Sequence, residues 1–100
     1  MAHANPTRTR GHLRRDRLPT PKDFYTSEGL APRGLGPWVE AGKCPFHDDH
    51  APSFRVNLET SRGRCMACGW SGDMLAFVQQ RHGLGFVDAA KRLGAWEEQP

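Results

Sequence analysis

The stretches Cys44-Pro45-Phe46-His47 and Cys65-Met66-Ala67-Cys68 decide how this chain folds. Each offers two metal-binding side chains separated by two residues, so one tight turn, here called a knuckle, supplies two ligands. A structural Zn²⁺ takes four nitrogen or thiolate ligands in a tetrahedron, and the two knuckles provide four. Gly69, directly after the second knuckle, can adopt a positive φ, which lets the turn bring backbone N–H groups close to sulfur. The sequence therefore predicts one structural zinc ion held by Cys44, His47, Cys65 and Cys68.

Other uses of the cysteines fit the pattern less well. The chain contains three cysteines, and an odd number without a secretory signal does not indicate a disulfide scaffold. Cysteines that serve only as small buried hydrophobes would leave the two matching gaps unexplained. A redox pair of the thioredoxin type needs a βαβ setting, which this short chain does not show. A zinc deaminase needs His-x-Glu and Pro-Cys-x-x-Cys, whereas His47 is followed by Asp48 and Asp49 and no proline precedes Cys65.

The fourth ligand has one alternative. His50 would reach the same ion through a longer Cys44-x5-His50 loop, and spacing alone leaves that arrangement open. The two-residue gap suits a knuckle better and favours His47.

Around the knuckles, the sequence resembles the CHC2-type zinc-binding domain of bacterial and phage DnaG-like DNA primases. Besides the knuckles, the resemblance is carried by Ala51-Pro52-Ser53-Phe54-Arg55-Val56-Asn57, Gly72-Asp73-Met74-Leu75-Ala76-Phe77-Val78 and Ala89-Ala90-Lys91-Arg92-Leu93. It covers roughly residues 43–94. The resemblance implies the same four zinc ligands and a role in recognising single-stranded template during primer synthesis in DNA replication.

Composition describes a small, basic domain. The chain has 100 residues and a formal net charge of +3, which is enough for one domain at most. It contains no run of about 18 apolar residues, so no membrane-spanning segment is expected. The first residues lack the apolar stretch of a signal peptide. With its cysteines reduced, the protein is expected in the cytoplasm.

Basic residues concentrate near the N-terminus. Residues 1–22 carry six basic side chains and one acid, a net charge of +5. Their polar composition predicts a disordered tail over residues 1–20, suited either to nucleic-acid phosphates or to solvation alone. Thr20-Pro21 predicts a helix start, with Gly29 as the stop. The rest of the segment 21–42 is expected to form a loop and the start of a strand at Trp38.

The residues between the knuckles predict a β-hairpin. Phe54, Val56 and Leu58 alternate with Arg55 and Asn57, which places the first three on a buried face and the other two on an exposed face. Glu59-Thr60-Ser61 predicts the turn. Arg62 and Arg64 on the returning strand would then join Arg55 in a basic patch beside the zinc, with Lys43 as a further basic neighbour. This patch is the expected DNA-binding surface. Because Arg62-Gly63-Arg64 stands where primases of this type often have aromatic residues, base stacking would fall to Trp38, Phe46 or Trp70 if they are exposed.

Two helices are expected after the second knuckle. The first begins at a Ser71 or Gly72 cap and ends at His82-Gly83, with Met74, Phe77 and Val78 facing the sheet. The second runs from about Phe86 to Leu93, with an inner stripe of Phe86, Ala89, Ala90 and Leu93. The predicted fold is a small α+β domain. A zinc-ribbon domain over residues 43–96 consists of a short antiparallel sheet with two zinc knuckles followed by two short helices, and residues 97–100 form a tail.

Two functions from different classes fit this sequence. The first is a non-enzymatic zinc module that binds single-stranded template and acts with a primase catalytic domain or helicase on another chain, in a phage, plasmid or integrated element. Primer synthesis needs an acidic, Mg²⁺-binding catalytic domain, which no segment of the sequence resembles. The second is a zinc-ribbon protein–protein adaptor of a mobile element that does not read template.

Overall fold

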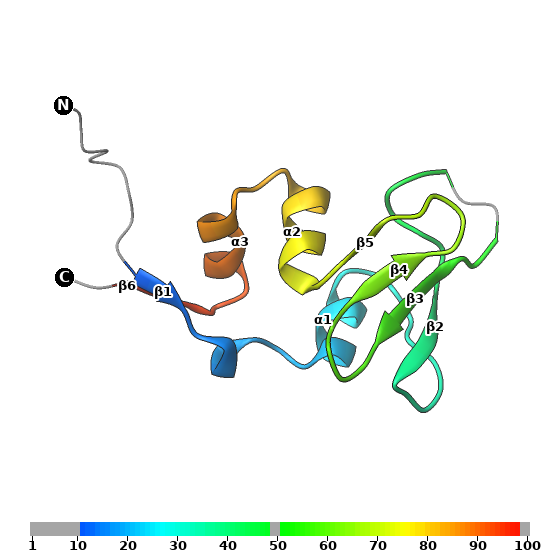
Figure 1. The fold of residues 1–100 in the computed structure, drawn as a ribbon, viewed down its shortest axis with the longest axis horizontal. Coiled ribbons are helices and arrows are strands. Elements are labelled where there is room, and N and C mark those ends of the chain that lie inside the picture. The colour runs from blue at the N-terminus through cyan, green and yellow to red at the C-terminus, as the bar shows by residue number, and fades with distance from the viewer. Residues whose placement is uncertain (1–10, 49–50, 99–100) are drawn as a thin grey trace.

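The computed structural model describes residues 11–48 and 51–98, and there it has a four-stranded sheet at one end and a two-stranded ribbon at the other (Figure 1). Both sheets are antiparallel, and the helices lie between them. The elements in chain order are β1 (Gly11–Leu13), a 3-10 turn (Arg15–Arg17), α1 (Pro21–Ser27), β2 (Trp38–Gly42), β3 (Phe54–Asn57), β4 (Gly63–Cys65), β5 (Ser71–Gly72), α2 (Met74–His82), α3 (Phe86–Arg92) and β6 (Trp96–Glu98). This arrangement confirms the predicted small α+β fold.

The four-stranded sheet has the order β2-β3-β4-β5 and contains the predicted hairpin. Phe54 pairs with Cys65, and Arg55 pairs with Arg64. Alternation along β3 buries Phe54 and Val56 completely and leaves Arg55 exposed, as the period of two predicts. Because β2 pairs with β3 along its length, the sheet begins at Trp38, before the ribbon boundary expected at residue 43.

Asn57 was expected on the exposed face, and that prediction is wrong. The residue is 7% exposed, and its side-chain Oδ1 accepts hydrogen bonds from the N–H groups of Glu59 (2.8 Å) and Thr60 (2.9 Å). The side chain therefore closes the hairpin turn instead of facing solvent. Asparagine commonly bonds nearby backbone in this way, and the competing bond overrides the strand alternation.

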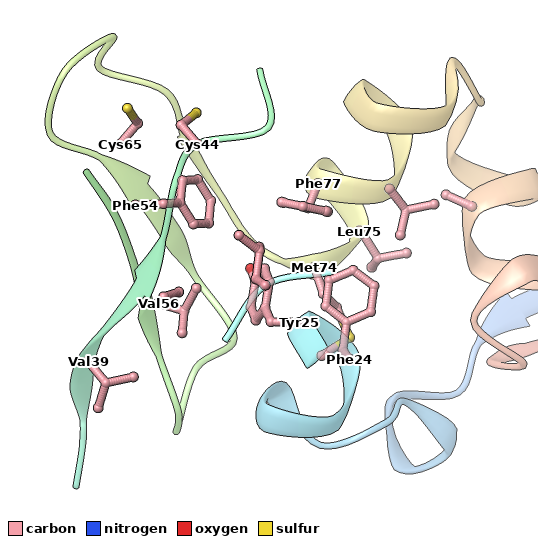
Figure 2. Packing of buried hydrophobic residues seen from close by; sticks show 14 of the residues in the cluster. Phe24, Tyr25, Val39, Cys44, Phe54, Val56, Cys65, Met74, Leu75 and Phe77 are labelled. Atoms are coloured by element: carbon pink, nitrogen blue, oxygen red, sulfur yellow. The ribbon is translucent and has the colours of Figure 1, made fainter. Parts of the chain in front are cut away.

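Helix α1 carries two aromatic side chains into the core. Thr20 caps it as predicted, because its hydroxyl accepts a hydrogen bond from Asp23 N–H, and Pro21 occupies the first turn. Phe24 and Tyr25 pack edge-on against each other and against Phe77 of α2, and Figure 2 shows them between the sheet and that helix. The Tyr25 hydroxyl also donates a 2.6 Å hydrogen bond to the Ser61 carbonyl at the hairpin turn. Helix α1 is thus bound to both the sheet and α2.

The two C-terminal helices follow the prediction with two differences. Asp73, and not Ser71 or Gly72, caps α2, since its carboxylate accepts a 2.9 Å hydrogen bond from Ala76 N–H. Gly83 ends α2 in the left-handed conformation, as expected. In α3, Ala89 and Ala90 are buried, but Phe86 is 45% exposed and does not belong to the inner stripe. Phe86 is the first residue of α3, so no further helical turn precedes it to complete that stripe.

Residues 11–20 are ordered, which contradicts the disordered tail predicted for residues 1–20; residues 1–10 lie outside the described part of the chain. Strand β1 pairs with β6, in the register Gly11 to Glu98 and Leu13 to Trp96. Leu13 and Trp96 also pack against the core cluster. Consequently Glu97 and Glu98, expected in a tail, lie in a strand. Among the described residues, no helix is long and apolar enough to cross a bilayer.

Candidate metal centre and sheet surface

The two knuckles lie at one end of the sheet, next to each other. The first follows β2, and the second begins at Cys65, the last residue of β4. Phe54 pairs with Cys65 and lies beneath the sulfur atoms of Cys44 and Cys65, as Figure 2 shows. The β3–β4 hairpin therefore sets the position of the second knuckle, and β2 sets that of the first.

Backbone N–H groups surround the sulfur atoms as predicted. The Cys65 sulfur accepts from the N–H groups of Ala67 (3.3 Å) and Cys68 (3.2 Å), and the Cys44 sulfur accepts from that of Phe46 (3.4 Å). Gly69 has a φ of +83°, and its N–H reaches the Cys65 carbonyl at 3.1 Å. This left-handed residue turns the chain back toward β5, which a side chain at this position would resist.

The four donor atoms converge on one point. The ligand atoms of Cys44, His47, Cys65 and Cys68 all lie within 4.8 Å of one another. The Cys44 and Cys68 sulfurs are 4.0 Å apart, and His47 Nε2 is 3.3 Å from the Cys65 sulfur. Four thiolate-type ligands at ~2.3 Å from a common ion would be ~3.8 Å apart in a tetrahedron. The donor set and its spacing therefore fit one tetrahedral Zn²⁺.

Backbone hydrogen bonds and burial give two of the thiols opposite pKa shifts. Burial raises the pKa of the Cys44 thiol to about 12, although the Phe46 N–H acts in the other direction. Burial also acts to raise the pKa of Cys65, but the N–H groups of Cys68 and Ala67 and the His47 ring outweigh it and lower that pKa to about 6. Since thiolates are the metal-binding form, zinc binding would release the protons that remain on these thiols.

The His50 alternative lies outside the described residues. Within residues 11–48 and 51–98, the Cys44, His47, Cys65 and Cys68 group is the one cluster of three or more potential ligands. Cys44 and Cys65 are buried, His47 is half-buried, and Cys68 is exposed. One side of the cluster is therefore accessible from solvent at Cys68.

Three arginines share the face of the sheet that points away from the core. Arg55 and Arg64 are direct partners across β3 and β4, and Arg62 precedes Arg64 by two residues. All three are exposed, and none forms an ion pair with another residue in the part of the chain that the structure describes. We call Arg55, Arg62 and Arg64 the arginine face. Lys43 is exposed too, but it lies just beyond the end of β2, outside the register that aligns the arginines.

Strand β2 adds two side chains to this face. Val39 and Ala41 are buried, so Trp38 and Glu40 point to the exposed side, and Glu40 pairs with Arg55. Trp38 is 42% exposed, whereas Phe46 and Trp70 are partly buried against Phe54 and Phe77. Of the three aromatic residues that sequence reasoning considered, Trp38 is thus the one available for stacking. The alternation of residues 38–41 is the signal that identifies Trp38 and also Glu40, which that reasoning missed.

Comparison with known proteins points to one family. A family model described as the CHC2 zinc finger matches residues 39–98. The DNA primases of Lactococcus lactis subsp. lactis and Deinococcus radiodurans are 48% identical over 52 residues and 44% identical over 64 residues. These matches cover 52% and 64% of this chain but 8% and 11% of the relatives. The chain therefore spans about a tenth of the length of these curated relatives.

A solved structure shares the fold. The crystal structure of the Aquifex aeolicus primase, containing its zinc-binding and RNA polymerase domains, matches with a TM-score of 0.57 at 27% identity. The match covers 83% of this chain and 23% of that one. The similarity thus extends beyond the knuckles to most of the described fold.

Proposed function

This chain belongs to the CHC2 zinc-finger family and is a zinc-binding domain of the DNA primase type, and from that premise we propose that it binds single-stranded template DNA through the arginine face. We also propose that Cys44, His47, Cys65 and Cys68 are the ligands of its one Zn²⁺. The ion would link the end of β2 to the end of β4 and so fix the strands that carry the arginines.

The observation that carries the DNA-binding proposal is the set of three aligned, exposed arginines that form no ion pair with another described residue. Arg55 and Arg64 lie side by side in register. Glu40 lies opposite Arg55 on β2 but forms no ion pair with it, so both guanidinium groups can contact a phosphate. Elsewhere in the described chain, basic side chains such as Arg14, Arg17 and Lys91 are already paired with carboxylates. The arginine face thus presents three neighbouring positive charges to a polyanion.

Template binding alone does not make a primer. Joining nucleotides requires metal ions held close to the reacting phosphates, usually by carboxylates. In the described residues, the cluster of potential metal ligands consists of cysteine and histidine, which suits a structural zinc site. We therefore propose that the domain works with a primase catalytic domain or a helicase during DNA replication and holds the template for that partner.

The test is the binding of a fluorescent single-stranded oligonucleotide to the zinc-loaded protein, followed by anisotropy across a salt series. Each phosphate contact contributes a slope of about 0.7 in the logarithm of affinity against the logarithm of salt concentration. Replacing Arg55, Arg62 or Arg64 by alanine should weaken binding and reduce that slope by about one contact. Arg92→Ala removes the same charge from an exposed position on α3 and should leave both unchanged.

Equal effects of Arg64→Ala and Arg92→Ala would contradict the proposal, because binding would then depend on net charge alone. A zinc-loaded protein that does not bind single-stranded DNA would instead favour the protein–protein adaptor. Addition of the protein to a primase catalytic domain provides the second measurement. More primer product with the wild type than with Arg64→Ala would link the arginine face to primer synthesis.

A further inference from the structure

A hollow opens on the same face of the sheet, between an aromatic ring and two of the arginines. It has a volume of about 310 Å³ and is lined by Trp38, Arg62, Gly63, Arg64, Gly69 and Ser71. That volume lies near the lower end of the range for small-molecule sites, ~300–1,000 Å³. The hollow is therefore large enough for one small molecule or one nucleotide and too small for a protein domain.

Strand register brings Trp38 and Arg62 to the same end of the sheet. Trp38 pairs with Asn57, and the Asn57 N–H donates to the carbonyl of Arg62, the residue just before β4, so the three residues lie in one row. The Asn57 side chain bends away to the hairpin turn and is buried. The hollow lies between Trp38 of β2 on one side and Arg62, Gly63 and Arg64 on the other, and it extends to Gly69 and Ser71.

The lining combines the two chemistries that a nucleotide needs. The exposed indole of Trp38 offers a flat apolar surface, on which any base can stack. Arg62 and Arg64 have no ion pair with another described residue and can contact phosphate oxygens. Gly69 has no side chain, and the space that a Cβ would occupy there is open, so one side of the hollow is unobstructed.

We propose that this hollow is a subsite for one nucleotide of a single-stranded nucleic acid, whose base stacks on Trp38 while Arg62 and Arg64 hold its flanking phosphates. The inference rests on the proposed function, since the same arginines carry both, but it adds a base-dependent contact to the charge-dependent one. The arginine face on its own would bind a strand without bases equally well. The subsite makes binding depend on the presence of a base.

The experiment compares oligothymidylate with an abasic strand of the same length, with zinc content and melting temperature measured for every variant. The wild type should bind the thymidylate strand about tenfold more tightly than the abasic strand. Trp38→Ala should remove that difference and leave the abasic affinity unchanged, and Trp38→Phe should restore most of it. Phe86→Ala removes an aromatic residue of similar exposure, 45%, from α3 and should have no effect.

The outcomes separate the subsite from the proposed function. If the wild type binds both strands equally, or if Trp38→Ala weakens binding to both by the same factor, the base subsite is wrong while binding by the arginine face stands. If neither strand binds, both proposals fail. Loss of the thymidylate preference in Phe86→Ala would also overturn the subsite, because the base would then stack elsewhere.

Discussion

The sheet β2–β5 and the terminal ribbon β1–β6 are both antiparallel, but different interactions support them. The sheet buries Val39, Phe54 and Val56 in the core, and the cysteine–histidine cluster joins the ends of its strands. The ribbon is three residues long on each side; it packs Leu13 and Trp96 against the edge of the core and carries several ion pairs on its surface. Arg14 contacts Glu97 and Asp16, Arg17 contacts Glu97, and Lys91 contacts Glu98.

This difference shows where the domain's stability is concentrated. Exposed ion pairs contribute little in water, whereas a structural zinc site and a filled aromatic core are cooperative. We expect the sheet to unfold with the whole domain and the ribbon to open on its own. Variants in each region test this difference in cooperativity. The expected loss of stability is largest at the metal centre and smallest at the terminal ribbon.

Loss of a zinc ligand should have the largest effect. Cys65→Ser should release zinc and unfold the sheet, because structural zinc sites contribute ~10–16 kcal/mol, as much as the ~5–15 kcal/mol by which a whole domain is stable. Met66→Ser changes an exposed residue of the same knuckle and should keep zinc. Zinc content and thermal melting by circular dichroism provide the measurement. A zinc-free Cys65→Ser protein with the wild-type spectrum and melting temperature would show that the metal does not support the sheet.

A side chain at Gly63 should be the next most damaging change. A Cβ there would lie 2.7 Å from Phe54 Cζ and 3.2 Å from the Tyr25 hydroxyl, both in the core. Gly63→Ala should therefore lower the free energy of unfolding by about 1–3 kcal/mol, measured by urea denaturation of the zinc-loaded protein. Gly85→Ser is the control, since that position is open and precedes α3, where a serine cap is favourable. Equal urea midpoints for Gly63→Ala and the wild type would contradict this prediction, because Phe54 and Tyr25 would then have moved to accommodate the methyl group without loss of stability.

Between the two regions, the Glu28 side chain at the C-terminal end of α1 contacts two residues of α2, Arg81 at 3.5 Å and His82. His82 Nε2 donates to the Glu28 carboxylate, at 3.1 and 3.2 Å from its oxygens, and that side chain is 9% exposed. Glu28→Gln should cost about 1 kcal/mol in urea denaturation, because it weakens a hydrogen bond to a charged group. Glu40→Gln, an exposed site on β2, should be neutral. If Glu40→Gln lowered the free energy of unfolding more than Glu28→Gln, charge on the sheet would contribute more to stability than the contact between the helices, contrary to this prediction.

Arg14→Ala should have the smallest global effect. It should leave zinc content and melting temperature unchanged and speed amide exchange in β1 and β6, and added salt should act the same way. Hydrogen bonds from Arg14 lower the pKa values of Glu97 and Asp16. Their contribution is therefore complete above the ordinary carboxyl pKa values and is lost as the pH falls through the lowered ones. A fall in melting temperature as large as that of Gly63→Ala would make the ribbon part of the cooperative core.

Local patterns allowed most of the sheet end to be predicted. The knuckle spacing identified the four clustered donors, and the alternation of residues 54–56 gave the buried side of β3. Helix α1 followed from Thr20 and Pro21, and the end of α2 followed from Gly83. These signals act over a few residues, so the sequence alone displays them.

The differences arose where distant or competing contacts decide the structure. Strand β1 was missed because its partner β6 is far away in the sequence and both strands are short and polar. Asn57 follows the strand alternation in sequence, but its bonds to the hairpin turn bury it. The hollow beside Trp38 combines residues of β2, β4 and β5 that are distant in the sequence, so no local spacing rule would have located it.

The pairing of β1 with β6 also has a consequence for the order of folding. Arg14 and Glu97 are 83 residues apart, whereas β3 and β4 are joined by a short turn. A hairpin forms in about 1–10 μs, but closing a long loop loses more chain entropy before any contact compensates for it. The hairpin should therefore form early and the terminal ribbon last. During synthesis, β1 would leave the ribosome first and stay unpaired until β6 follows, after the zinc-binding sheet is complete.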